Sequence, residues 1–134
     1  GLAVARRSLG EPLTAKIEIY LADTMGELGL WYRLADVAFI GGSLQPVGGH
    51  NPYEAAQLDA AILHGPHVGN FAQVYAALSQ AGVAREVPDQ KTLCTQLREL
   101  DAVELAAMTQ AAHGVLSDHS GATDAARNAV LELL

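Results

Sequence analysis

The chain has 134 residues, half of them hydrophobic, and a formal charge of −7 at pH 7. This length suits one domain with one modest core, and this apolar content is far too high for a disordered chain. The acidic balance, with eight scattered basic residues, argues against a nucleic-acid-binding surface.

Strand and helix signals alternate along the chain. Apolar runs rich in β-branched or aromatic residues and bounded by turn residues predict five strands, at residues 2–5, 17–21, 36–40, 60–63 and 84–87. Helix formers with start or stop signals predict helices between and after them, at residues 24–34, 52–58, 71–80 and 88–100. The sequence Thr24-Met25-Gly26-Glu27 has the form of a capping box and is expected to open the first of these helices.

Two further helices are predicted at the end of the chain, at residues 101–115 and 124–134. Their apolar residues recur at three- and four-residue spacing, and a polar stretch at 117–121 separates them. We expect both helices, about residues 101–134, to pack on the larger body.

The alternation predicts an α/β fold, with a parallel sheet and helices on both faces. In such sheets, ligands bind at the carboxyl ends of the strands. The loops at residues 23–27, 41–51 and 64–70 all follow predicted strands. We therefore expect these three loops to converge at one edge of the sheet.

The most informative stretch runs over residues 39–54, where an apolar strand leads into the glycine pairs 41–42 and 48–49. Asn51 is a good N-cap, and Pro52 suits the first helical position. Amides at the start of a helix suit an anion such as phosphate, and Glu54 lies in the same first turn. The pattern predicts a nucleotide pocket.

The cysteine and histidine residues restrict the remaining classes of site. Cys94 is the only cysteine, which excludes an internal disulfide and fits a reducing compartment. We expect it to be a small buried residue of a helix. The five histidines lack the spacing of a zinc site, so no metal is expected. No apolar run approaches the roughly 20 residues that span a bilayer, and no signal-peptide pattern opens the chain.

Four motifs in register resemble the 3-deoxy-D-manno-octulosonic acid (Kdo) transferases of Gram-negative lipopolysaccharide synthesis. They are D-T-M-G-E-L at residues 23–28, A-D-V-A-F-I-G-G-S at 35–43, G-G-H-N-P-Y-E at 48–54, and G-P-H with N-F at 65–71. The resemblance covers nearly the whole chain. Within it, Asp59 stands where relatives usually carry a small or glycine residue, and His64 replaces an apolar residue.

The resemblance implies a GT-B glycosyltransferase, with two Rossmann-like domains that face each other across a cleft. The chain would be a single, truncated nucleotide-sugar-binding domain, residues 1–134, from the C-terminal half. The family transfers Kdo from CMP-Kdo to the lipid A precursor at the cytoplasmic face of the inner membrane. The chain would lack the N-terminal domain, which carries the acceptor site, the membrane-associating segment and the catalytic base. It would also lack the first strand and helix of the donor domain and a basic stretch before Arg6 that contributes to CMP binding in the family.

The resemblance also implies the site residues. None is catalytic, no metal or cofactor is expected, and this part alone should be soluble and inactive. The residues implied in CMP-Kdo binding form two segments: Met25, Gly26 and Glu27, then Asn51, Pro52, Tyr53 and Glu54. By analogy with other GT-B enzymes, Glu54 would accept hydrogen bonds from ribose hydroxyls.

Structural explanations compete with these assignments. Glu27 could serve only the capping box, Asn51 and Pro52 only the helix start, and Glu54 only the helix dipole. His50 and His67 are equally compatible with tying down loop carbonyls and with contacting phosphate or sugar. Trp31 and Tyr32 are expected in the core, and Arg6 and Arg7 at a solvated strand end.

Two other functions also stay open: the donor domain of a GT-B enzyme that uses a UDP-sugar, and a non-catalytic interaction domain.

Overall fold

The described part of the computed structural model, residues 1–119 and 131, contains two separate parallel sheets. β1 (Val4–Arg6) pairs with β2 (Ile19–Leu21). In the second sheet, β4 (Ala61–His64) lies between β3 (Val37–Ile40) and β5 (Ala84–Glu86). All five predicted strands form, and the α/β class with parallel pairing is confirmed.

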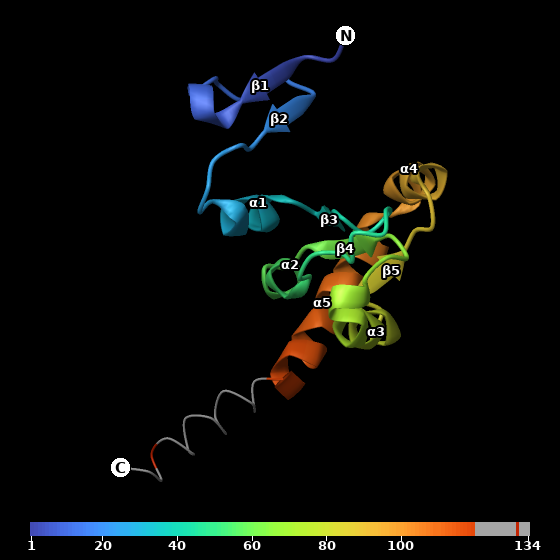
Figure 1. Cartoon of the computed structure of the whole chain (residues 1–134). Helices are drawn as coiled ribbons and strands as arrows, with labels where there is room; N and C mark the ends of the chain where they lie inside the picture. Colours follow the sequence, from blue (N-terminus) through green and yellow to red (C-terminus); the bar gives the residue numbers. More distant parts are fainter. Residues whose placement is uncertain (120–130, 132–134) are drawn as a thin grey trace.

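The predicted helices between the strands also form. They are α1 (Leu28–Leu34), α2 (Tyr53–Gln57), α3 (Ala72–Gln80), α4 (Gln90–Glu99) and α5 (Ala102–His119), with the short 3-10 helices η1 (Arg7–Leu9) and η2 (Gly69–Phe71). Figure 1 shows the β1–β2 pair set apart from the other strands, with α1 on the side of the main body that faces it.

The predicted single sheet is divided between β1 and β3, each of which pairs on one side only. A common doubly wound sheet has the strand order 3-2-1-4-5-6. Omitting strand 1 from that order leaves one pair and one group of three. The observed orders, β1-β2 and β3-β4-β5, reproduce this pattern.

The core is centred on β4, whose four residues are all buried. Successive side chains of a strand point to opposite faces, so both faces of this sheet are covered. Ile62 belongs to the main apolar cluster, which also draws on α2, α3 and α5, while the neighbouring Leu63 is buried on the other face. The sequence of a central parallel strand is typically a continuous apolar run, and this pattern made β4 predictable.

The end of the chain differs in part from the prediction. The first of the two C-terminal helices is predicted at residues 101–115, but α5 continues to His119. As expected, this helix packs on the larger body, against α2, α3 and β4. The second, at residues 124–134, lies outside the described residues except for Leu131. Among the described helices, none is both long and apolar enough to cross a membrane.

Two local predictions are wrong. Thr24 and Glu27 do not form a capping box, because Gly26 adopts φ +82°, which interrupts the helical path, and α1 begins only at Leu28. Cys94 is exposed rather than buried, since α4 lies at the surface and contains no buried residue. The predicted helix around Cys94 does form, as α4, but it buries none of its residues.

Candidate functional site

Two of the three predicted loops interlock at the carboxyl ends of β3 and β4. Ser43 is fully buried in the loop after β3, and its hydroxyl accepts a hydrogen bond from the Gly65 N–H at 2.9 Å. Its carbonyl accepts another from the His67 N–H, also at 2.9 Å. A Cβ on Gly65 would lie 2.6 Å from the Leu44 nitrogen and closer still to the Ser43 carbonyl. Only glycine allows this approach of the two loops.

The second glycine pair makes the same kind of contact. Gly48 adopts φ +104°, its carbonyl accepts a hydrogen bond from the Asn70 N–H at 3.1 Å, and the Asn70 side chain fills the place where a Cβ would stand. The Gly49 N–H donates to the Gly42 carbonyl at 3.0 Å. The convergence of the loops at 41–51 and 64–70 is therefore confirmed.

The loop leads directly into α2. The Asn51 side chain accepts a hydrogen bond from the Tyr53 N–H at 3.0 Å, but the N-cap residue of α2 is Pro52 rather than the predicted Asn51. Pro52 is buried and lies one residue before α2 rather than at its first position, and its carbonyl accepts from the Ala56 N–H at 3.1 Å. The Tyr75 hydroxyl donates to the His50 carbonyl at 2.8 Å and anchors the segment from behind.

Glu54 lies against α1. Its Oε1 would be 3.4 Å from a Cβ on Gly29, in the first turn of α1. Burial, and secondarily the charge of Glu54, raise the pKa of Tyr32, one turn further along the same helix. The second predicted binding segment, residues 51–54, therefore lies beside the helix that follows the first one.

The first segment is arranged differently. Met25 is 97% exposed, and Gly26 has a left-handed backbone. The Glu27 carboxylate accepts hydrogen bonds from Arg7 Nε at 3.0 Å and Arg7 Nη2 at 2.6 Å, and from the Thr24 hydroxyl. The Arg7 guanidinium first, and then Thr24, lower the pKa of Glu27 from 4.5 to about 2.

A second set of bonds joins the same two loops. The Ser8 N–H and hydroxyl donate to Asp23 at 2.9 and 2.8 Å, which holds the pKa of Asp23 below its ordinary value. Arg6 Nε lies 3.3 Å from the same carboxylate. The loop at 23–27 is therefore tied to η1, after β1, rather than to the glycine loop.

Sequence reasoning missed this network. Arg6 and Arg7 were expected at a solvated strand end; both are partly exposed, but each pairs with an acid of the adjacent loop. The available signal was topological. β1 and β2 are neighbouring parallel strands, so the residues that follow them meet at one edge.

His50 and His67 take structural roles through their backbones. The His50 carbonyl accepts from Tyr75, and the His67 N–H donates to Ser43. Both side chains are exposed at the same edge as the glycine loop. Contact of either imidazole with a ligand stays a prediction.

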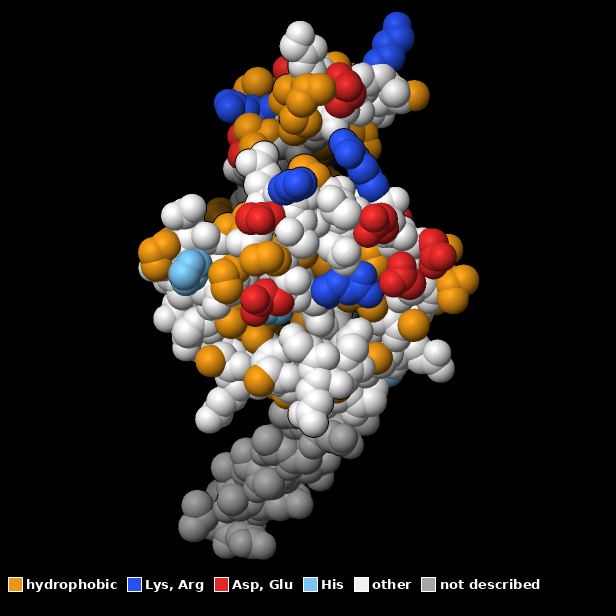
Figure 2. Space-filling view, turned by 90° about the vertical axis from the view of Figure 1, so that its right-hand side faces the viewer, with side chains coloured by type: hydrophobic (Ala, Val, Ile, Leu, Met, Phe, Trp, Pro, Cys, Tyr) orange, Lys and Arg blue, Asp and Glu red, His pale blue; other side chains and the backbone are white. Residues whose placement is uncertain are grey.

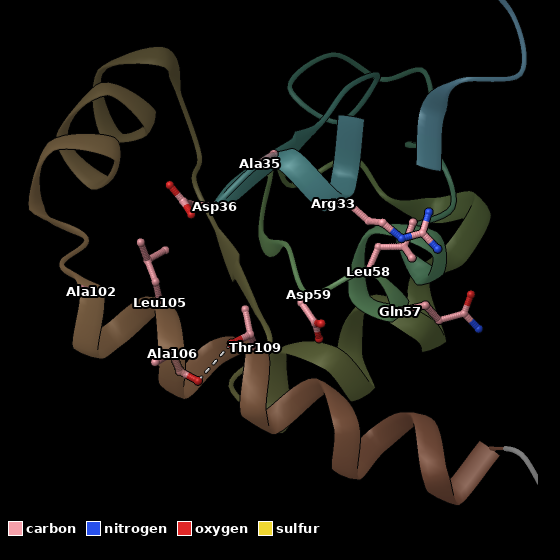
Figure 3. Close-up of a pocket in the computed structure, with 10 residues that line it drawn as sticks. All are labelled: Arg33, Ala35, Asp36, Gln57, Leu58, Asp59, Ala102, Leu105, Ala106 and Thr109. Carbon is pink, nitrogen blue, oxygen red and sulfur yellow. Dashed lines mark hydrogen bonds between the residues drawn. The ribbon is translucent and has the colours of Figure 1, made fainter. Parts of the chain in front are cut away.

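A cavity of about 810 Å³ lies at the opposite edge, near the amino ends of β3 and β4. Figure 3 shows Asp36 and Asp59, which precede these strands, together with Arg33 from α1 and with Leu105 and Thr109 from α5. No predicted binding residue lines this cavity. It is therefore distinct from the site that the loops predict.

Figure 2 shows acidic and basic side chains interspersed over one face of the molecule. Within residues 1–119 and 131, no group of three or more His, Cys, Asp or Glu side chains is placed to hold a metal ion.

Comparisons with known proteins relate the chain to one group of enzymes. It is 39% identical over 127 residues to the 3-deoxy-D-manno-octulosonic acid transferase of Bordetella pertussis. The aligned region covers 92% of this chain and 29% of that protein. It is 47% identical over 83 residues to a probable mitochondrial 3-deoxy-D-manno-octulosonic acid transferase of Arabidopsis thaliana. Here the aligned region covers 60% of this chain and 19% of that protein. No protein-family model matches the chain.

A solved structure shares the fold. It is the C-terminal CMP-Kdo binding domain of WaaA from Acinetobacter baumannii, with a TM-score of 0.76 and 37% sequence identity. The match covers 86% of this chain and 61% of that one. The chain therefore corresponds to less than a third of the Bordetella relative and to part of the solved domain.

Proposed function

Because the chain belongs to the Kdo transferase family and matches only part of its members, we propose that it is the donor-binding unit of such an enzyme and binds CMP-Kdo. The observation that carries this proposal is the match in both fold and sequence to a domain described as binding CMP-Kdo. The likeness to that domain amounts to 37% identity over 86% of the chain.

The loop geometry supports a division of roles among the predicted residues. Asn51 and Pro52 hold the start of α2 in place, and the positive end of the helix dipole would favour a phosphate group beside it. Glu54 is exposed beside α1, where its carboxylate can accept hydrogen bonds from ribose hydroxyls. Met25 and Gly26 are exposed just before α1, the helix against which Glu54 lies, and Tyr53 precedes Glu54 in α2. Donors aimed at the phosphate would also stabilise the departing CMP as charge develops on it.

The activity of the whole enzyme forms the wider part of the proposal. It would transfer Kdo to the lipid A precursor at the cytoplasmic face of the inner membrane, with no metal or cofactor. Attack by the acceptor hydroxyl would need a general base, which we assign to a separate N-terminal domain. The 134-residue chain would then bind the donor without catalysing transfer.

A nucleotide titration tests the proposal. CMP and UMP are added in turn to isotope-labelled protein, and amide NMR shifts are followed in the unaltered chain, in Glu54→Ala and in Glu99→Ala. Glu99 is an exposed acid at the end of α4, so its variant controls for the loss of one negative charge. We expect saturable shifts at residues 25–27 and 51–54 with CMP, retained in Glu99→Ala and strongly reduced in Glu54→Ala.

Other outcomes would point elsewhere. Equal or tighter binding of UMP would favour a GT-B donor domain for a UDP-sugar. A well-dispersed spectrum that neither nucleotide perturbs would contradict the donor-site proposal and favour a non-catalytic interaction domain.

A further inference from the structure

The proposed donor site is lined by acids, although its ligand is an anion. Glu27 and Asp23 lie in the loop after β2, and Glu54 lies beside α1. Each would repel a phosphate unless a cation lies nearby. Among the described basic residues, Arg33 lines the cavity at the opposite edge and extends its Nη1 to Gly29, beside Glu54, while Arg85 pairs with Glu104 at 3.2 Å. Arg6 and Arg7, at the end of β1, stand at the carboxyl edge next to the predicted loop at residues 23–27, whereas Lys91 follows β5 in the other sheet.

Arg7 is the better placed of these two. Arg6 belongs to β1 and lies near Asp23. Arg7 instead reaches across to the predicted donor loop, where its Nε and Nη2 bind both carboxylate oxygens of Glu27, adjacent to the open turn at Gly26. A two-point contact of this kind fixes the plane of a guanidinium as well as its position.

The pair leaves donors for a ligand. A guanidinium has five N–H groups; Glu27 takes two of them, and the Tyr20 side chain also pairs with Arg7. The Arg7 side chain remains 42% exposed. The Glu27 oxygens, by contrast, are already engaged by Arg7 and Thr24.

We infer that Arg7 is the residue that binds the phosphate of the donor, and that Glu27 is a positioning residue that orients Arg7. The inference rests on the proposed function, because it names the partner of the nucleotide phosphate in the same site. It changes the role of Glu27: its carboxylate acts on the ligand through Arg7 rather than by direct contact.

The test compares a nucleotide that carries a phosphate with one that does not. CMP and cytidine are titrated by NMR into the unaltered chain, Arg7→Ala, Arg7→Lys, Glu27→Gln and the control Arg98→Ala, which removes an exposed cation from α4. Cytidine binding that does not saturate is compared by its initial shift slope. Circular dichroism checks that each variant is folded, and Arg7→Lys keeps the charge if Arg7→Ala does not fold.

We expect Arg7→Ala to weaken CMP binding about tenfold or more, as loss of a charge-assisted hydrogen bond predicts, and to leave cytidine binding unchanged. Arg7→Lys should weaken CMP binding less than Arg7→Ala does, because an ammonium keeps the charge but not the two-point geometry. Glu27→Gln should weaken CMP by a smaller factor, again without effect on cytidine.

Two results would overturn the inference. Equal losses for CMP and cytidine would mean that the ion pair only maintains the loop. Unchanged CMP binding in Arg7→Ala, with binding still lost in Glu54→Ala, would reject the role of Arg7 and keep the donor site. If the unaltered chain binds no CMP, the proposed function fails and the role of Arg7 fails with it.

Discussion

Replacing Gly65 by alanine is expected to force apart the two loops at the carboxyl ends of β3 and β4. The added Cβ would lie 2.6 Å from the Leu44 nitrogen and closer still to the Ser43 carbonyl. Both obstacles are backbone atoms. Ser43 is also fully buried and bonded to Gly65 and His67, so the loop cannot move aside without breaking those bonds.

The cost follows from these contacts. Separation of the loops breaks the hydrogen bonds from the Gly65 and His67 N–H groups to Ser43, each worth about 1 kcal/mol. Overpacking adds about 1–3 kcal/mol. The total loss of about 3–5 kcal/mol is a large part of the roughly 5–15 kcal/mol that holds a domain folded.

Gly41→Ala provides the matched control in the same pair of loops. Its Cβ would meet nothing within 4 Å, and its φ lies outside the left-handed region, so we expect a change within about 0.5 kcal/mol. Urea unfolding followed by far-UV circular dichroism gives both free energies, provided that the m-values agree. Equal unfolding midpoints for the two variants would refute the reasoning.

Three further predictions follow from single contacts. Because Arg7 holds the pKa of Glu27 at about 2 rather than 4.5, the stability from this carboxylate is present above pH 4.5 and is lost as the pH falls toward 2. Glu27→Gln should therefore flatten the acid side of a plot of unfolding free energy against pH, and parallel curves would contradict this. Asp59 has φ +63° and lies 2.6 Å from His113; Asp59→Gly should be about 1 kcal/mol more stable in urea than Asp59→Ala, because both lose the contact but only glycine relieves the strain. The exposed Cys94 thiol should react with an aromatic disulfide reagent nearly as fast in native as in unfolded protein, and strong protection would show that α4 is covered.

The sequence located the elements that depend on local chemistry. β4 was predictable because three of its four buried residues, Ala61, Ile62 and Leu63, form the apolar run expected of a strand that is covered on both faces. The turns were predictable for a related reason: Gly42, Gly48 and Gly49 all have left-handed φ values that other residues avoid. The hydrogen bond from the Tyr53 N–H to the Asn51 side chain likewise joins residues only two positions apart.

What the sequence did not show depends on neighbours that are distant along the chain. The pairing of Arg7 with Glu27 exists because β1 and β2 lie side by side, which no local pattern records. The capping-box pattern at Thr24 was misleading, because the same glycine that lies within it interrupts the helix. The exposure of Cys94 depends on how tightly α4 packs, and its own sequence carries little information on that.

The division of the sheet gives α1 a role beyond that of a connection. The two predicted binding segments belong to loops of different sheets, the first after β2 and the second after β3. Trp31 of α1 packs on Tyr20 of β2, with ring centroids 5.4 Å apart, while the next residue, Tyr32, packs against the main core. Adjacent residues of a helix point in directions about 100° apart, so this one helix can contact both units. A nucleotide that touches Gly26 and Glu54 would bridge the same two units, so the geometry of the proposed donor site would depend on how α1 holds them together.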